Sequence, residues 1–107
     1  MIDETAKARS KNELISVLRE TESMLRKPDN DFVWSAWNGP EEAISGIESH
    51  ITSIESGDFS RLSRLSLLYA PTGRIQEVSV SSGWGDAFLV LAERFDAALD
   101  WVKAATA

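Results

Sequence analysis

One segment, residues 70–86, most limits what this chain can fold into. It reads APTGRIQEVSVSSGWGD, with one proline and three glycines, and apolar residues recur at helical spacing on both sides of it. A connection of this length inside a small domain is uncommon, and it is usually either functional or disordered. Its Ile, Val and Trp content argues against disorder, so we expect an ordered segment packed on the helices. A strand over residues 75–80 would have no partner strand, which favours an extended or single-turn path.

The sequence outside this segment predicts four helices, from the spacing of apolar residues and from residues that begin or end helices. They are expected at about residues 10–27, 40–56, 59–69 and 86–105. Residues 1–10 either extend the first helix or lie outside it, and a short helical turn is expected to carry Trp34 and Trp37. The predicted fold class is therefore all-α, an irregular bundle of four main helices with a long ordered connection before the last helix. It forms a single helical domain over residues 1–107.

Particular residues suit the ends of these helices. Ser10 and Glu13 fit a capping box, in which each side chain accepts a hydrogen bond from a free backbone N–H. Pro40 fits the first position of the second helix, and Asp58 fits the cap of the third. The second helix is the clearest, because its isoleucines form one narrow apolar seam. These isoleucines are Ile44, Ile47, Ile51 and Ile54.

The net charge of −6 has an uneven distribution along the chain. Residues 28–60 contain seven acidic residues and no lysine or arginine, while the rest of the chain is nearly balanced. This pattern disfavours nucleic acid and anionic membranes as partners, because proteins that bind them carry basic patches. It favours a basic partner or simply a soluble surface. On a helix, Glu41, Glu48 and Glu55 would fall within about 40° of one another, beside the isoleucine seam.

Several classes of protein are disfavoured by what the sequence lacks. There is no cysteine, which excludes disulfides and thiolate chemistry. No apolar run approaches the roughly 18 residues that a membrane-spanning helix needs. The first residues, MIDET, lack the basic and apolar regions of a signal peptide. We therefore expect a cytoplasmic protein.

The candidate catalytic and metal-binding residues are few. His50 is the only histidine, and a zinc site with only carboxylates for its other ligands is rare, so a structural or surface role is expected. Glu41 and Glu42, or Glu55 and Asp58, could bind magnesium, but such helical sites take acids from at least two helices. A solvated or protein-binding face is the expected role of these acids. We predict no catalytic residue, no metal site and no cofactor.

The glycines and tryptophans of the 70–86 segment also admit two interpretations. The glycines around Arg74 and Trp84 could hold an anion at the start of the last helix, but Asp86 would repel it, so structural turns are expected. Trp37 and Trp101 are predicted to pack in the core. Trp34 and Trp84 flank turns, where an indole ring anchors either a loop or a partner, and we favour loop anchoring.

A resemblance to known proteins covers roughly residues 32–80. It is carried by Trp34-x-x-Trp37, by Gly57-Asp58, by the LYAPTG sequence of residues 68–73, and by Gln76-Glu77. These residues resemble a pattern in short uncharacterised bacterial helical proteins, and some small acidic proteins of this kind are immunity proteins. The resemblance implies a protein that binds and neutralises a toxin of the same or a neighbouring cell.

The functional hypothesis from the sequence is a non-catalytic protein-binding module, most concretely an immunity-type protein that neutralises a basic toxin domain. Its expected partner-binding residues are acidic ones on and after the second helix, together with two residues of the 70–86 segment. These residues are Glu41, Glu48, Glu55, Asp58, Trp84 and Arg74. The alternatives are a small carboxylate-metal-dependent hydrolase and a homo-oligomeric structural module. The sequence leaves the oligomeric state open.

Overall fold

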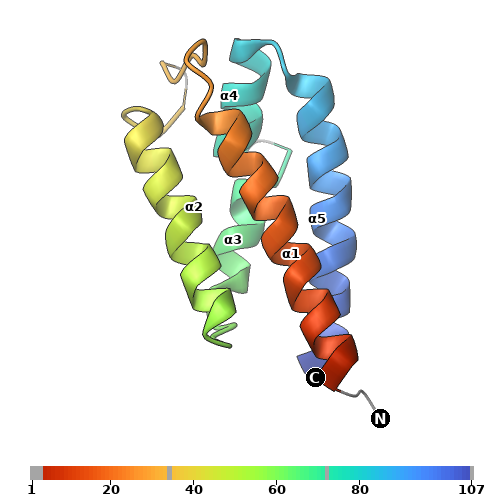
Figure 1. Cartoon of the computed structure of the whole chain (residues 1–107). Helices are drawn as coiled ribbons and strands as arrows, with labels where there is room; N and C mark the ends of the chain where they lie inside the picture. The colour runs from red at the N-terminus through yellow and green to blue at the C-terminus, as the bar shows by residue number, and fades with distance from the viewer. Residues whose placement is uncertain (1–3, 34, 72, 107) are drawn as a thin grey trace.

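The computed structural model describes residues 4–33, 35–71 and 73–106, and the side chains of residues 4–7 and 106 lie outside this description. The described part of the chain contains five α-helices and no strand, so the all-α prediction is confirmed (Figure 1). The helices are α1 (Glu4–Leu25), α2 (Pro40–Glu55), α3 (Leu62–Leu68), α4 (Arg74–Ser82) and α5 (Gly85–Thr106).

The helices form an elongated bundle of 46 × 23 × 20 Å with α1 between two neighbours. The most extensive packing joins α1 to α5, followed by α1 to α2 and α4 to α5. Figure 1 shows α1 and α5 side by side and antiparallel, with the start of α1 and the end of α5 at the same end of the bundle. The α1 helix therefore touches both of the other long helices.

The core is made of apolar residues from every helix. On α2, Ile47, Ile51 and Ile54 are buried and Ile44 is half-buried, which confirms the isoleucine seam. Burying each of these side chains contributes about 1.5–3 kcal/mol to folding. The largest fully buried side chains outside α2 are Leu14, Leu18, Leu25, Leu65, Ile75, Phe88 and Phe95.

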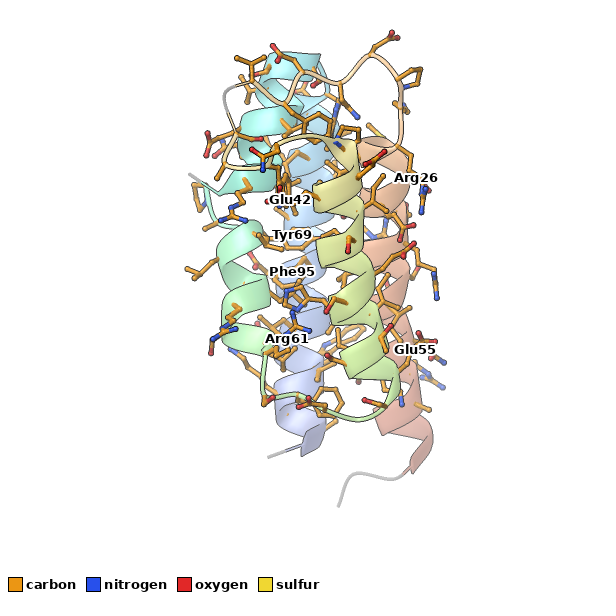
Figure 2. All side chains as sticks on the ribbon, turned by 90° about the vertical axis from the view of Figure 1, so that its left-hand side faces the viewer. Arg26, Glu42, Glu55, Arg61, Tyr69 and Phe95 are labelled. Atoms are coloured by element: carbon orange, nitrogen blue, oxygen red, sulfur yellow. The ribbon has the colours of Figure 1, made fainter. Side chains whose placement is uncertain are left out.

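A hydrogen bond and a ring stack join three helices inside this core. The ring of Tyr69, which follows α3, stacks on Phe95 of α5 with 4.0 Å between the ring centroids (Figure 2). The Tyr69 hydroxyl lies 2.6 Å from the Thr21 hydroxyl of α1. Because Thr21 donates its own proton to the carbonyl oxygen of Val17, Tyr69 is the donor to Thr21. Burial raises the pKa of the Tyr69 hydroxyl, which keeps this donor protonated.

The 70–86 segment is ordered, but its predicted extended or single-turn path is wrong. Residues 74–82 form α4, which buries Ile75, Val78 and Ser79 at steps of three and one. Gly83 ends the helix in the left-handed conformation, with φ of 86°. The N–H groups of Gly83 and Trp84 bond back to the carbonyls of Val80 and Ser79. This is a Schellman end, so the glycines that suggested an irregular connection instead terminate a short helix.

Two predictions about helix ends and one about a short helical turn are also wrong. The α1 helix begins at Glu4, so Ser10 lies inside it and Ser10 with Glu13 forms no capping box at its start. The α3 helix begins at Leu62, and Asp58 instead accepts hydrogen bonds from the backbone N–H and hydroxyl of Ser60 in the turn before it. Residues 35–39 form bends and no helix, while Trp34 lies outside the described residues.

Gly73 permits the close turn between α3 and α4. A Cβ atom on Gly73 would lie 2.5 Å from the carbonyl oxygen of Leu67 and 2.7 Å from that of Leu68. The Gly73 N–H also donates to the carbonyl of Ala70 at 2.8 Å. These neighbours are backbone atoms, so they cannot move away by changing a rotamer.

We predict opposite effects of one substitution at two glycines. Gly73→Ala should lower the free energy of unfolding by about 1–3 kcal/mol, because the added methyl group overlaps backbone carbonyls. Gly46→Ala, in the middle of α2 with no atom within 4 Å of the added Cβ, should raise it by about 0.5–1 kcal/mol. Urea unfolding followed by circular dichroism measures both. Equal effects at the two sites would contradict the described α3–α4 turn.

A second prediction concerns the hydroxyl pair in the core. Thr21→Val removes the acceptor and leaves the buried Tyr69 hydroxyl without one, which should cost about 1–3 kcal/mol. Tyr69→Phe leaves the Thr21 hydroxyl bonded to Val17, so it should cost only about 0.5–1.5 kcal/mol. Unfolding curves of the two single variants test this order. A larger loss for Tyr69→Phe would contradict the assigned direction of the hydrogen bond.

Candidate protein-binding surface

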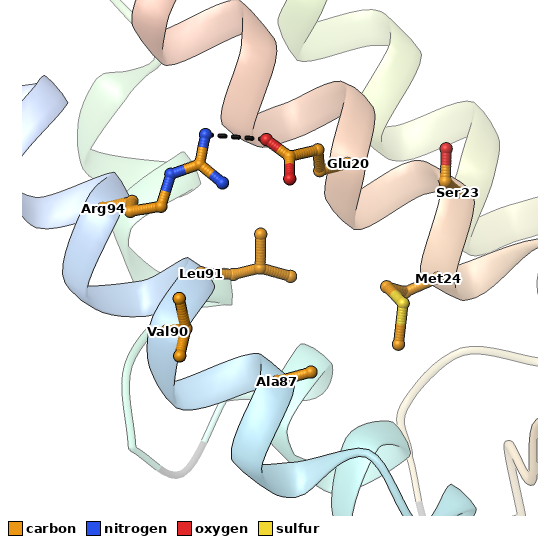
Figure 3. A pocket seen from close by; sticks show the side chains of 7 residues that line it. All are labelled: Glu20, Ser23, Met24, Ala87, Val90, Leu91 and Arg94. Atoms are coloured by element: carbon orange, nitrogen blue, oxygen red, sulfur yellow. Dashed lines mark ion pairs between the residues drawn. The ribbon is translucent and has the colours of Figure 1, made fainter.

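Acidic side chains of α1 face α5 and hold its one arginine. Arg94 of α5 lies 2.7 Å from a carboxylate oxygen of Glu20 and 3.5 Å from one of Glu13 (Figure 3). The hydrogen bond from Arg94 lowers the pKa of the Glu20 carboxyl. Arg94 is therefore turned toward α1 and engaged with two carboxylates, and it does not neutralise the acidic residues on the rest of α5.

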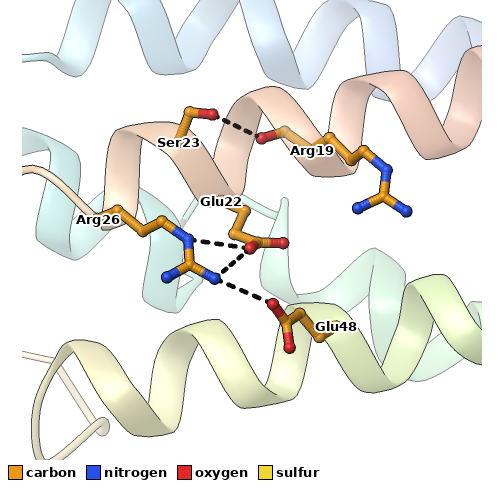
Figure 4. A network of polar contacts seen from close by, with 5 residues as sticks. All are labelled: Arg19, Glu22, Ser23, Arg26 and Glu48. Atoms are coloured by element: carbon orange, nitrogen blue, oxygen red, sulfur yellow. Dashed lines mark hydrogen bonds and ion pairs between the residues drawn. The ribbon is translucent and has the colours of Figure 1, made fainter.

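Two arginines, Arg19 in α1 and Arg26 directly after it, face α2 and hold two of its glutamates. Arg26 lies 2.6 Å from Glu22 of α1 and 3.0 Å from Glu48 of α2 (Figure 4). Arg19 lies 3.8 Å from Glu55. The paired carboxylates raise the pKa of Arg26, chiefly through its hydrogen bonds to Glu22. The α1–α2 boundary is thus lined by ion pairs between the two helices.

This boundary contains part of the acidic stripe that the sequence predicts as a binding surface. Glu48 and Glu55 lie beside α1 and are already paired with arginines, so a basic partner would compete with Arg26 and Arg19 for them. Glu41 is exposed in the first turn of α2, and Asp58 is exposed in the turn before α3. Hydrogen bonds from Ser60 lower the pKa of Asp58. The four acids therefore do not form one open face.

Trp84 serves as a loop anchor, as the sequence suggested. Its side chain is 9% exposed, and its indole N–H donates to the side-chain oxygen of Asn30 at 2.7 Å. Next to it, the backbone N–H of Asp31 donates to the Ser82 hydroxyl at 2.8 Å. These bonds tie the loop after α1 to the corner between α4 and α5. Trp84 is therefore buried, which leaves little of it for contact with a partner.

The other two described tryptophans differ from each other. Trp37 is buried as predicted, and the guanidinium of the exposed Arg74 lies 5.9 Å from its ring centroid. The prediction that Trp101 packs in the core is wrong, because its side chain is 56% exposed. The buried face of α5 passes through Phe95 and Val102, and a residue one position from Val102 is turned by about 100° from that face. Trp101 therefore lies on the outside of α5.

The solvent-facing side of α5 combines exposed apolar and acidic residues. Leu89, Val90 and Trp101 are 59%, 56% and 56% exposed, and they make up half of the large exposed hydrophobic residues of the described chain. Four exposed carboxylates lie on the same helix and have no ion pair with any described residue. We call these seven residues the α5 outer face: Asp86, Leu89, Val90, Glu93, Asp96, Asp100 and Trp101.

A hollow of about 450 Å³ lies beside this face, between α1 and α5. Most of its lining is apolar, from Met24 of α1 and from Ala87, Val90 and Leu91 of α5. Figure 3 shows the Glu20–Arg94 ion pair on one side of these apolar side chains. Val90 belongs both to the hollow and to the α5 outer face, so the two features are continuous.

The remaining sequence candidates are His50 and the acidic residues considered for a metal site. His50 is buried on α2, and its pKa is lowered by burial and by the charges of Arg61 and Arg64. The described part of the chain holds no group of three or more histidine or acidic residues placed to bind a metal ion. None of the helices in this part is long and apolar enough to cross a membrane.

Comparisons with known proteins add no relative. No protein-family model matches the chain, and neither a curated protein nor a solved structure matches it. The candidate surface therefore rests on the geometry and charge of this chain.

The α5 outer face was missed in the sequence, although a signal for it is present. Leu89, Val90 and Leu91 are consecutive, and three consecutive residues on a helix span about 200°, which is too wide for one buried face. Of these three residues only Leu91 is buried, so Leu89 and Val90 point outward. The acids at positions 86, 93 and 100 recur every seven residues, the same spacing as the predicted α2 stripe.

We predict that the two ion pairs of Arg26 matter unequally to stability. Arg26→Gln should lower the melting temperature more than Glu48→Gln, because it removes the partner of Glu22, a largely buried carboxylate. The second oxygen of Glu22 is buried and has no hydrogen bond with any described residue, so the loss of Arg26 would leave the whole carboxylate without compensation. Glu48 is exposed, and exposed ion pairs contribute little. Thermal melts of the two variants measure this difference. Equal falls in melting temperature would contradict the prediction.

Proposed function

We propose that this protein is a non-catalytic protein-binding module of the immunity type, which binds and neutralises a basic partner domain through an acidic surface. One observation carries the proposal: four carboxylates on the outer side of α5 have no ion pair among the described residues and lie beside three exposed apolar side chains. Under this proposal the protein works in the cytoplasm of a bacterium, where a toxin domain would meet it.

The charges support the α5 outer face over α2 as the main contact. Glu48 and Glu55 already have arginines beside them, so displacing those arginines would offset part of any gain from a basic partner. Among the described residues, the α5 carboxylates have no such pair to break. Unpaired surface charges of one sign attract oppositely charged proteins over a distance and raise the association rate. Glu41 in the first turn of α2 and Asp58 in the turn after this helix add to the negative electrostatic potential of the molecule.

The apolar residues support binding rather than a merely solvated acidic face. Exposed hydrophobic residues that lie singly are ordinary, whereas a group with a half-exposed tryptophan suits a contact surface. Tryptophan is enriched among the residues that dominate binding energy in interfaces. In this proposal the acids of α5 speed the approach of the partner, and Leu89, Val90 and Trp101 slow its release.

The test compares two matched pairs of charge-removing substitutions in binding to a partner captured from the cell of origin. Asp96→Asn with Asp100→Asn should slow association on the order of tenfold at low salt, because it halves the number of unpaired carboxylates on α5. Glu48→Gln with Glu55→Gln should have a smaller effect, since these acids are already paired. Surface plasmon resonance at low and high salt gives both rates.

The outcomes of this experiment separate the possibilities. A basic partner whose association slows with salt and with the α5 substitutions supports the proposal. Association that is indifferent to salt and to both pairs would overturn it. A loss confined to the Glu48 and Glu55 pair would assign the contact to the α1–α2 boundary and overturn the assignment to α5.

A further inference from the structure

We infer that the segment of the partner that lies on α5 is a basic amphipathic helix, with its apolar side on the α5 outer face and one side chain in the hollow beside Val90. This inference rests on the proposed function and specifies the chemistry of the partner.

The spacing of the exposed apolar residues fits a helix of about three turns. Eleven residues separate Val90 from Trp101, and at about 1.5 Å per residue this places them roughly 17 Å apart along α5. A partner helix lying along α5 would place apolar residues from successive turns against both ends of this stretch. Between them lies Ala97, a small exposed residue that lets another helix approach closely.

The hollow between α1 and α5 provides a place for a protruding side chain. It lies where two antiparallel helices run side by side, and helices pack by placing side-chain ridges of one into grooves of another. Met24 on its wall is flexible and polarisable, so it adapts to the shape of an inserted residue. The Glu20–Arg94 ion pair on one side gives this groove a polar edge.

A helix suits this surface better than an extended peptide. Extended peptides bind by adding a strand to an open sheet edge, and the described part of the chain has no sheet. Amphipathic helices instead dock in grooves between helices, through apolar residues at steps of three and four. The hollow beside the α5 outer face offers such a groove, and Val90 joins it to the exposed apolar residues of that face.

The charges decide which helix could cover this face. Asp86 precedes the apolar residues along α5, and Glu93, Asp96 and Asp100 lie between Val90 and Trp101. Of the two cations of α5, Arg94 is held by α1 and Lys103 is not. A partner helix needs lysines or arginines beside its apolar stripe to match these four carboxylates. A second copy of this chain would bring four carboxylates against four, and an anionic membrane would be repelled, so both fit poorly.

The experiment uses the full chain and synthetic helical peptides as probes. The main probe is a peptide of leucine and lysine at amphipathic spacing. One control peptide has glutamate in place of lysine, and the other has the leucines and lysines in scrambled order. Amide chemical shifts of the labelled protein report where each peptide binds. The amphipathic leucine–lysine peptide should shift residues 86–101 of α5 and Met24, and the two controls should bind at least tenfold more weakly.

Substitutions on the protein locate the contact. Val90→Ser and Trp101→Ser should each weaken binding of the leucine–lysine peptide on the order of tenfold, as expected for anchor residues. Leu67→Ser is the matched control, because Leu67 is a 69% exposed hydrophobic residue on another helix, α3. It should leave affinity unchanged. Circular dichroism verifies that each variant is folded. If Trp101→Ser destabilises the chain, the peptide affinity of Asp96→Asn with Asp100→Asn gives an independent test of the same surface.

Each result either supports or overturns the inference. Shifts on α2 in place of α5, equal binding of the scrambled peptide, or equal losses for Leu67→Ser and Val90→Ser would overturn it. Concentration-dependent dimerisation in light scattering that Val90→Ser abolishes would assign the face to a second copy and overturn it as well.

The same variants separate this inference from the proposed function. A native basic partner that responds to the α5 carboxylates but not to Val90→Ser or Trp101→Ser would leave the proposed function standing and overturn the helical docking. A native partner that ignores salt and all acidic substitutions would overturn the proposed function, whatever the peptides do.

Discussion

The two-sided burial of α1 is the constraint on which the rest of this structure depends. Val17 and Leu18 are fully buried, and α1 packs on both α2 and α5. A helix packed between two others meets charged side chains of both neighbours, and its own side chains form ion pairs with each of them. Glu13 and Glu20 of α1 face Arg94 of α5, while Arg19, and Arg26 directly after the helix, face glutamates of α2. The α1 side of the bundle therefore pairs charges on one side of each neighbour, while the outer carboxylates of α5 have no ion pair among the described residues.

This pairing of charges along α1 explains why the distribution of charge along the sequence differs from its distribution on the folded surface. Residues 28–60 hold the whole charge imbalance of the sequence, yet two of their acids, Glu48 and Glu55, lie beside Arg26 and Arg19. Residues 61–107 are balanced in sequence, yet their basic residues before position 86 lie on or beside α3 and α4, and Arg94 is turned to α1. The outer side of α5 is left with a local excess of negative charge. The local excess of charge on α5 thus depends on the packing of Arg94 against α1, which the net charge of the segment does not reveal.

Features set by local patterns could be predicted from the sequence, and features set by packing could not. The isoleucine seam and the all-α class follow from helical spacing, and Trp84 beside a glycine turn was correctly assigned to a loop anchor. The α4 helix was missed because Gly83 was treated as part of an irregular connection, while its left-handed conformation ends a helix. Helical spacing alone places Trp101 about 100° from the buried Val102, so its exposure follows from a local pattern. The pairing of Glu48 depends on which helices become neighbours, and no local pattern contains that information.

The bond between Trp84 and Asn30 has a consequence for how one end of the bundle opens. Together with the bond from Asp31 to Ser82, it joins two stretches that lie some fifty residues apart in the chain. Neither stretch can fray alone without breaking both bonds, so the loop after α1 and the corner before α5 form one cooperative unit of local unfolding. Their backbone amides would then exchange with solvent at a shared rate, set by the joint opening rather than by the exposure of either stretch.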